Sequence, residues 1–195
     1  MQLTHKHQRD NIIMIEDTVL ETPNLILCHW RESDAEKLYE MAKNPQIADN
    51  AGWIPHISPD YSLAVIRLVY ATKPNRETFA IIDKRDPESP IGSISLSVKS
   101  IKGHEIENEA EIGYWIGSEY QGTGHATEAL KELICYAFVT KRLTKLWCSY
   151  FENNEASKHV MESCGFMYDH TENDFYVPML REYRVMHICT LSNGK

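Results

Sequence analysis

The residues with the clearest chemical potential form a glycine-rich turn between an apolar stretch and an amphipathic one. Glycine lets the main chain approach a ligand closely, and the free N–H groups at a helix start, backed by the helix macrodipole, attract an anion. We therefore expect this turn to bind a pyrophosphate through its main chain. The turn comprises Gln121, Gly122, Thr123, Gly124, His125 and Ala126.

Three other interpretations of this turn can be compared with that expectation. A Walker phosphate loop needs a lysine after its second glycine, but Gly122 is followed by Thr123. A dinucleotide fingerprint needs glycine or alanine where Thr127 stands, and it needs alternating strands and helices, which the preceding segment lacks. The third interpretation is an ordinary helix entrance whose glycines only make a tight turn, and the turn by itself leaves it open.

The flanking segments place the turn between a strand and a helix. Residues 110–116 are short and largely apolar, as expected for a strand. Between residues 125 and 138 the apolar side chains recur at helical spacing, which predicts an amphipathic helix. These apolar positions are Ala126, Ala129, Leu130, Leu133, Ile134, Ala137 and Phe138.

Turn signals and hydrophobic patterns predict seven strands and four helices in all. Helix starts are indicated by Ser33 with Glu36, by Ser58 before Pro59, and by Asn154. Three successive strands without an intervening helix predict an antiparallel meander, and therefore an α/β fold of the α+β type. The expected strands are 25–30, 78–83, 91–98, 110–116, 144–151, 166–168 and 183–189, and the expected helices are 33–43, 58–73, 125–138 and 154–164.

The composition indicates one globular domain. Of 195 residues, 43% are hydrophobic and 25% are charged, which suits a single sizeable core. Residues 1–17 show no clear period, so we expect a flexible extension followed by one domain at residues 18–195. No apolar run has the length of a signal peptide or a membrane span, and the five cysteines form no CxxC pair. We therefore expect a cytoplasmic protein without membrane association.

Charge and ligand spacing argue against two further classes. The formal net charge is -8, and no basic patch of the kind that nucleic acid requires is visible. No HExxH motif or multi-cysteine spacing is present, so no metal site is expected. A homodimer is compatible with the sequence, which does not determine the oligomeric state.

Two segments together resemble a known family. The turn resembles motif A of the GNAT superfamily of N-acetyltransferases, Gln/Arg-x-x-Gly-x-Gly/Ala, with Gln121, Gly124 and Ala126 at the motif positions. Residues 154–157 and 164–166 resemble its motif B, in the expected order and at the expected distance. The combination of EIGYW, QGTGHATEA, NNEAS and CGF is similar to the RimJ/RimL branch, which acetylates protein N-termini and, in relatives, small amines. The resemblance extends over about residues 19–190.

The resemblance implies both a fold and a chemistry. The fold would be the GNAT fold, a mixed, mostly antiparallel seven-stranded sheet flanked by about four helices and splayed between its fourth and fifth strands. The chemistry would be acetyl transfer from acetyl-CoA. Two departures from the family pattern stand out. Asn24 and Cys28 replace arginines of the usual first strand, and Met161 replaces the tyrosine that protonates the leaving thiolate in much of the superfamily.

The resemblance also assigns roles on the donor side. Pantetheine is expected along Trp115 and Ile116, with main-chain amides near Ile116 polarising the thioester carbonyl. Asn154 is expected to hydrogen-bond the pantetheine. Ser157, one helical turn later, is expected to contact the sulfur and is the candidate acid. The alternative is that Asn154 only caps its helix and that Ser157 is a small buried residue.

Four further residues have expected roles. An amine is mostly protonated at neutral pH, so a base is useful, and Glu111 resembles the family's glutamate base. Its alternative is a solvated carboxylate at a strand end. Trp53 and Tyr114 are expected on the acceptor side, although Trp53 equally suits a packing role. His125 is expected to contribute its main-chain amide, with its imidazole at the surface.

The sequence therefore predicts an acetyl-CoA-dependent N-acetyltransferase. The preferred acceptor is the α-amino group of a protein or peptide N-terminus, attacking directly in a ternary complex. Two alternatives stay open at this point. The acceptor can instead be a small amine, such as a polyamine, an amino acid or an aminoglycoside, or the chain can be a coenzyme A-binding sensor without catalysis.

Overall fold

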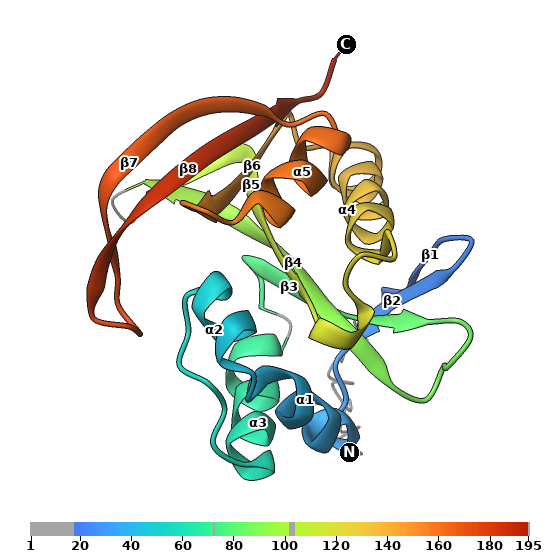
Figure 1. Cartoon of the computed structure of the whole chain (residues 1–195). Helices are drawn as coiled ribbons and strands as arrows, with labels where there is room; N and C mark the ends of the chain where they lie inside the picture. The colour runs from blue at the N-terminus through green and yellow to red at the C-terminus, as the bar shows by residue number, and fades with distance from the viewer. Residues whose placement is uncertain (1–17, 72, 102–103, 195) are drawn as a thin grey trace, which may run out of the picture.

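The computed structural model describes residues 18–71, 73–101 and 104–194, and the expected extension at residues 1–17 lies outside this range. The described residues form one eight-stranded sheet in the order β1-β2-β3-β4-β5-β6-β8-β7, with helices on both faces (Figure 1). Neighbouring strands are antiparallel except β5 and β6, which are parallel. The strands are β1 (Leu20–Glu21), β2 (Leu25–His29), β3 (Arg76–Asp83), β4 (Pro90–Ile101), β5 (His104–Ile116), β6 (Lys145–Phe151), β7 (Met167–Val177) and β8 (Glu182–Ser192).

All seven predicted strands are present, and β1 is an eighth. It contains only Leu20 and Glu21, which pair with β2, and two residues are too few to show an alternation. Strand β7 is also longer than the three residues expected. Most of its side chains are exposed, so no apolar pattern marks it, and pairing with β8 is what keeps it extended. Strand β5 begins at His104, inside the segment expected to be a polar loop.

Five α-helices, rather than four, flank the described sheet. They are α1 (Ala35–Ala42), α2 (Pro45–Ala51), α3 (Pro59–Val65), α4 (His125–Cys135) and α5 (Glu155–Ser163). Helices α3 and α4 each continue into a wider π turn, at Ile66–Tyr70 and Tyr136–Thr140. No helix within the described residues is long and apolar enough to cross a membrane.

The additional helix, α2, occupies a segment expected to be a loop. Asn44 and Pro45 end α1 as predicted, but the same pair also starts α2. The Asn44 Oδ1 atom accepts the Gln46 N–H at 2.9 Å, and Pro45 takes the first helical position. Gly52, at φ 77°, then ends the helix. The signals for α2 are therefore present in the sequence, although no helix is predicted between residues 43 and 58.

The start of α1 also differs from the expectation. Ser33 does not cap this helix, because Glu32–Asp34 form a turn of 3-10 helix before it. The Asp34 carboxylate instead accepts the Arg31 N–H at 2.9 Å. Ser58, by contrast, caps α3 as predicted. The capping-box spacing thus marked the right place for a helix start but the wrong capping residue.

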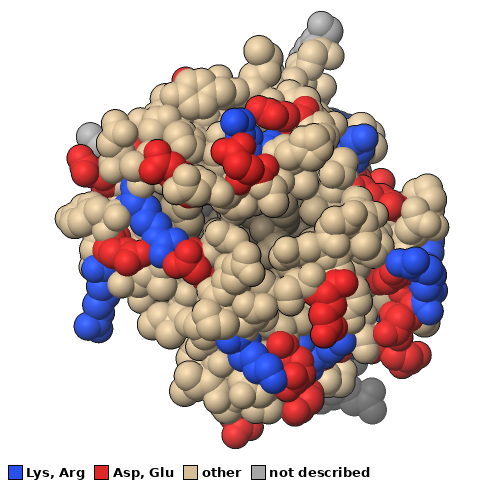
Figure 2. Space-filling view, in the orientation of Figure 1, with Lys and Arg blue, Asp and Glu red and all other residues tan. Residues whose placement is uncertain are grey.

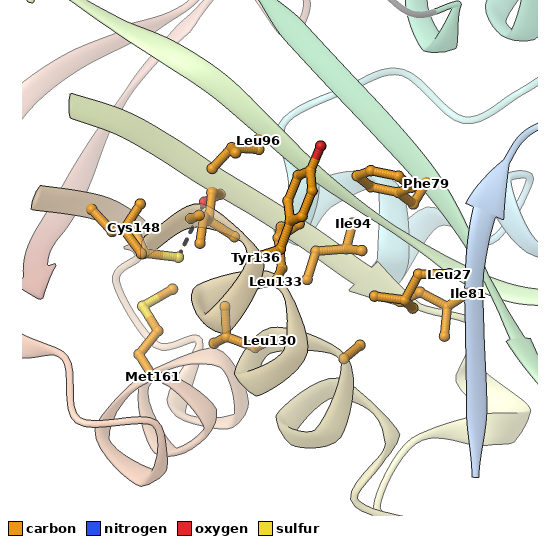
Figure 3. Close-up of a cluster of buried hydrophobic side chains, with 14 of the residues drawn as sticks. Leu27, Phe79, Ile81, Ile94, Leu96, Leu130, Leu133, Tyr136, Cys148 and Met161 are labelled. Carbon is orange, nitrogen blue, oxygen red and sulfur yellow. Dashed lines mark hydrogen bonds between the residues drawn. The ribbon is translucent and has the colours of Figure 1, made fainter. Parts of the chain in front are cut away.

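Each face of the sheet carries its own core. Helices α4 and α5 cover one face and α1, α2 and α3 lie on the other (Figure 1). Figure 3 shows strand side chains meeting Leu130 and Leu133 of α4, both fully buried, and each such side chain contributes about 2 kcal/mol. The Cys148 thiol donates to the Ile112 carbonyl oxygen at 3.2 Å in this core. Strand residues of the core include Leu27, Phe79, Ile81, Ile94 and Leu96.

The sheet opens between β5 and β6, as the family resemblance implied. The two strands pair only from Glu109 with Lys145 to Ile112 with Cys148. Beyond that point β5 continues beside β4 to Ile116, while β6 continues beside β8. The predicted splay is therefore confirmed, and it leaves a gap between two strands that are otherwise neighbours.

Candidate active site

Two cavities meet where β5 and β6 separate. The loop cavity, of about 460 Å³, is bounded by the glycine-rich turn and by the starts of α4 and α5. The sheet cavity, of about 360 Å³, lies over β3, β4 and β5. The face of the molecule drawn in Figure 2 has a hollow near its centre, and mostly uncharged residues surround this hollow. Residues that line both cavities are Asn50, Ala51, Tyr114, Trp115, Asn154 and Ser157.

The loop cavity has the features of an anion site. Gly122 and Gly124 have φ angles of 74° and 86°, a left-handed backbone that suits glycine. The first bond within α4 runs from the Glu128 N–H to the Gly124 carbonyl at 3.0 Å, and no side chain caps the helix within the described residues. The N–H groups of residues 125–127 are therefore available for a bound anion.

His125 does not lie at the surface, contrary to the expectation. Its side chain is only 7% exposed, with Nδ1 2.8 Å from Thr123 Oγ1 and Nε2 3.5 Å from Asp83 Oδ2. The Thr123 hydroxyl donates to the Tyr120 carbonyl at 2.6 Å, so His125 Nδ1 is the donor toward Thr123. Hydrogen bonds from Arg85 hold the pKa of Asp83 down at about 2. The imidazole thus lies between the turn and Asp83 of β3, and it helps to hold the turn in position.

Two more contacts fix the position of the turn. Gln121 Nε2 donates to the Ile116 carbonyl oxygen at 3.0 Å, which ties the turn to the end of β5. The Glu128 carboxylate accepts the Asn24 N–H at 2.9 Å and the Thr22 hydroxyl at 2.5 Å. Burial acts to raise the pKa of Glu128, but these bonds outweigh it and lower the pKa. Asn24, a departure from the family pattern, therefore anchors the start of α4.

The end of β5 provides free main chain beside the turn. Within the described sheet, β5 has no partner on its β6 side after Ile112. Trp115 and Ile116 of this stretch line the loop cavity. Peptide groups that face the gap can therefore bond a ligand that lies between β5 and β6.

Asn154 and Ser157 stand at the junction of the two cavities. Asn154 Oδ1 accepts the Ser157 N–H at 3.2 Å, which confirms its predicted role as the cap of α5. The Tyr114 hydroxyl donates to the Ser157 carbonyl oxygen at 3.1 Å, and burial raises the pKa of Tyr114 strongly. Met161, one turn further along α5, is buried in the core. The expected contacts of Asn154 and Ser157 with a cofactor stay predictions.

Glu111 lines the sheet cavity. Its carboxylate lies 3.1 Å from Lys99 Nζ, and its side chain is 43% exposed. Lys99 also lies over the Trp147 ring, 5.2 Å from the centroid. The neighbouring Glu109 instead bonds Trp147 Nε1 at 2.5 Å and does not line either cavity. Glu111 is therefore distinguished from Glu109 by its position and by its ion pair with Lys99.

The chain matches the family model of the acetyltransferase (GNAT) domain over residues 24–167. It belongs to this family. The putative ribosomal N-acetyltransferase YdaF of Bacillus subtilis is 30% identical over 148 residues, which cover 69% of this chain and 73% of that relative. The chain is therefore an acetyl-CoA-dependent N-acetyltransferase, and its relatives place it in the RimJ/RimL-like branch.

Solved acetyltransferases share this fold. RimL, a ribosomal L7/L12 alpha-N-protein acetyltransferase in complex with coenzyme A, has a TM-score of 0.73 at 17% identity, covering 90% of this chain and 98% of that one. Spermidine N-acetyltransferase from Vibrio cholerae, in complex with CoA and spermine, has a TM-score of 0.69 at 21% identity, covering 86% and 95%. These likenesses establish that the acetyltransferase has the GNAT fold.

In the acetyltransferase, Trp53 combines both interpretations of its role. Its ring stands edge-on to Trp115, with 5.5 Å between the centroids, and it packs against the core formed with α1 and α3. It also lines the sheet cavity. The Trp53 side chain therefore both packs against the core and lines the cavity. Its contact with a substrate stays a prediction.

Sequence reasoning missed several residues of the acetyltransferase's sheet cavity. Alternation along the middle of β3 was a usable signal, because side chains two residues apart share one face of a strand. The cavity set comprises Arg76 and Thr78, and the core set comprises Phe79 and Ile81. The residues contributed by other elements, including Tyr61, Tyr70, Phe151, Met179 and Met186, carried no such signal.

The acetyltransferase's cysteines and acids form no metal centre in the described part of the chain. No group of three or more His, Cys, Asp or Glu side chains there could hold a metal ion. Burial raises the pKa of the Cys164 and Cys189 thiols. Neither thiol belongs to a cluster that suggests redox or metal chemistry.

Proposed function

We propose that this enzyme acetylates the α-amino group of a protein or peptide N-terminus, by direct attack on acetyl-CoA in a ternary complex. The observation that carries the proposal is that two cavities meet at the gap between β5 and β6. A donor in the loop cavity and an acceptor in the sheet cavity would meet at that junction. The ribosomal-type relative and the coenzyme A complex of RimL support this choice of acceptor and donor.

On the donor side, we propose that the main chain of Gln121, Gly122, Thr123, Gly124, His125 and Ala126 holds the diphosphate. The left-handed glycines and the uncapped start of α4 support this assignment. Pantetheine would then follow Trp115 and Ile116, with Asn154 as a further contact from α5. Main-chain N–H groups near Ile116 would stabilise the oxyanion that forms when the amine attacks.

Proton transfer in the proposed reaction falls to two side chains. Glu111 would accept the amine proton, directly or through water, and the Lys99 ion pair would hold its carboxylate in place. As the C–S bond breaks, the Ser157 hydroxyl would give a proton to the departing thiolate and would regain one from water. Trp53 and Tyr114 would border the acceptor amine, since both line the sheet cavity.

The proposal is tested by measuring thiol release from acetyl-CoA with a panel of amines. The panel contains short N-terminal peptides, spermidine, free amino acids and an aminoglycoside, and calorimetry measures acetyl-CoA binding in parallel. We expect the highest kcat/KM with a peptide. A higher kcat/KM with spermidine would contradict the proposed acceptor, and saturable acetyl-CoA binding without turnover would indicate a sensor.

A further inference from the structure

Three unpaired polar atoms surround the sheet cavity. Among the described residues, the buried side-chain nitrogen or oxygen atoms that lack a hydrogen-bond partner are Trp53 Nε1, Arg76 Nε and Thr78 Oγ1. All three residues line this one cavity. Buried polar groups in folded proteins are nearly always hydrogen-bonded, so three exceptions around the same space point to a ligand that supplies the missing partners.

The chemistry of these atoms defines what the ligand must offer. The Trp53 indole and the Arg76 guanidinium carry N–H groups that can only donate, and the Thr78 hydroxyl can donate as well. Thr78 is 1% exposed, so solvent does not satisfy its hydroxyl from outside the cavity. A ligand group with several acceptor lone pairs, beside a cation, fits this set of donors.

The strand register shows how far apart the charged residues stand. Arg76 of β3 lies opposite Ser97 of β4, and Ser97 lies opposite Glu111 of β5. Neighbouring strands are about 4.8 Å apart, so the main chains at Arg76 and Glu111 are separated by roughly 10 Å. Thr78 is two residues along β3 from Arg76 and therefore faces the same side of the sheet. The cavity floor thus has a cation on one side and the proposed base on the other.

The charge balance of the cavity favours an anion over a polycation. Among the described lining residues, Arg76 and Glu111 are the only Lys, Arg, Asp or Glu side chains. The Glu111 carboxylate is already bonded to Lys99, and no ion pair joins Arg76 to any carboxylate of the described residues. A polyamine would therefore meet an unpaired guanidinium and would find no free carboxylate to bind its additional ammonium groups.

We propose that the acceptor amine also carries a carboxylate, which Arg76 binds while Trp53 and Thr78 donate further hydrogen bonds to it. This inference rests on the proposed function and specifies its substrate class. The planar guanidinium matches a carboxylate with two parallel bonds. An acidic side chain within the first two residues of a peptide would place a carboxylate several bonds from the α-amine, as the separation of Arg76 and Glu111 requires.

The test uses pairs of short peptides that differ only in Glu or Gln at one of the first two positions, with spermidine as a third acceptor. We expect the parent enzyme to prefer a Glu peptide over its Gln partner by about tenfold in kcat/KM, because hydrogen bonds to a carboxylate are stronger than those to a neutral amide. Arg76→Gln should remove this preference by slowing only the Glu peptide. Arg76→Lys should keep part of the preference for the Glu peptide. The lysine retains the positive charge but lacks the planar guanidinium that forms two parallel bonds with a carboxylate.

Controls separate specificity from folding. Arg67→Gln changes an exposed arginine outside both cavities and should leave the preference unchanged. The melting temperature and the acetyl-CoA dissociation constant of Arg76→Gln show whether the domain and its donor site are intact. Equal rates with Glu and Gln peptides in the parent, or an equal loss with every acceptor in Arg76→Gln, would overturn the inference. Failure to acetylate any amine would instead remove the proposed function, and the inference with it.

Discussion

The two cavities of this enzyme are built in different ways. The loop cavity owes its chemistry to main chain, namely two left-handed glycines and the free N–H groups at the start of α4. The sheet cavity owes its chemistry to side chains that reach it from β3, β5, α3, the loop after α2 and the hairpin of β7 and β8. Under the proposed function, six consecutive residues hold the diphosphate of the donor, whereas acceptor selection depends on side chains contributed by much of the fold.

A physical consequence follows from this difference. Main-chain amides are offered by any residue that adopts the required backbone, so the loop cavity tolerates side-chain changes that preserve φ. The sheet cavity depends on particular side chains, such as Glu111 and Arg76, whose replacement removes a charge and not only a shape. Substitutions in the two cavities should therefore affect different measurable constants.

The largest expected effect comes from removing the proposed base. Glu111→Gln keeps the side-chain size but cannot accept a proton, so kcat/KM should fall by about 100-fold, the lower end of the usual range for general base catalysis. Steady-state kinetics with a peptide acceptor measure this change.

The control for this prediction is Glu109→Gln on the same strand. Glu109 bonds Trp147 and lies outside both cavities, so its replacement should leave kcat/KM unchanged. Acetyl-CoA affinity should be normal in both variants. An unchanged kcat/KM for Glu111→Gln would exclude Glu111 from the mechanism and leave the sheet cavity with a binding role only.

A smaller effect is expected in the loop cavity. Gly124→Ala forces a side chain onto a backbone at φ 86°, although a Cβ atom there would meet nothing within 4 Å. The cost is therefore backbone strain of about 1 kcal/mol and a shift of the amides that face the ligand. We expect acetyl-CoA to bind about tenfold more weakly by calorimetry, with little change in the acceptor KM, since one 1.4 kcal/mol step in binding corresponds to a factor of ten.

Gly165→Ala is the matched control for this variant. Gly165 follows α5 at φ 88°, and a Cβ atom there would make an ordinary contact, 3.7 Å from Leu191. The two substitutions should lower the melting temperature to a similar extent, but only Gly124→Ala should weaken acetyl-CoA binding. Equal binding by both variants would show that the turn does not hold the diphosphate.

The fold was largely predictable because its signals are local. The periodic apolar positions of α4, the Asn154 cap and the strands before the turn were all found at their predicted places. The splay between β5 and β6 came from the family resemblance and is confirmed. The two-residue β1 and the exposed β7 escaped prediction, because pairing partners rather than their own side chains keep them extended.

The candidate site was predictable only in part, for the same reason. The turn and the residues of α5 belong to sequence motifs, so the sequence alone proposes them as site residues. Arg76 and Thr78 belong to no motif, and only the register of β3, β4 and β5 brings Arg76 into line with Glu111. The buried imidazole of His125 was missed because its partner, Asp83, is 42 residues away in the chain. Contacts between residues far apart in the chain therefore determine the parts of the site that local sequence patterns do not predict.

The smallest effect concerns Asp83, which supports the loop cavity through His125. Its folded pKa, about 2, lies below the ordinary value of 3.8 because Arg85 hydrogen-bonds the carboxylate. The unfolded chain therefore takes up the proton first as the pH falls. The stabilisation from Asp83 is complete above about pH 4 and disappears as the pH approaches 2. The melting temperatures of the parent and Asp83→Asn should accordingly differ at pH 6 and converge toward pH 2.

The control is Asp174→Asn, which replaces an exposed aspartate on β7. The melting temperatures of this variant and of the parent should not converge as the pH falls. Because Asp83 faces His125 behind the turn, its replacement should also weaken acetyl-CoA binding by a few-fold while the acceptor KM stays constant. This outcome would confirm that the contacts of Asp83 and His125 with the turn affect binding of the donor alone. A change in acceptor KM without a change in acetyl-CoA affinity would show instead that the two cavities are coupled through β3, the strand that carries both Asp83 and Arg76.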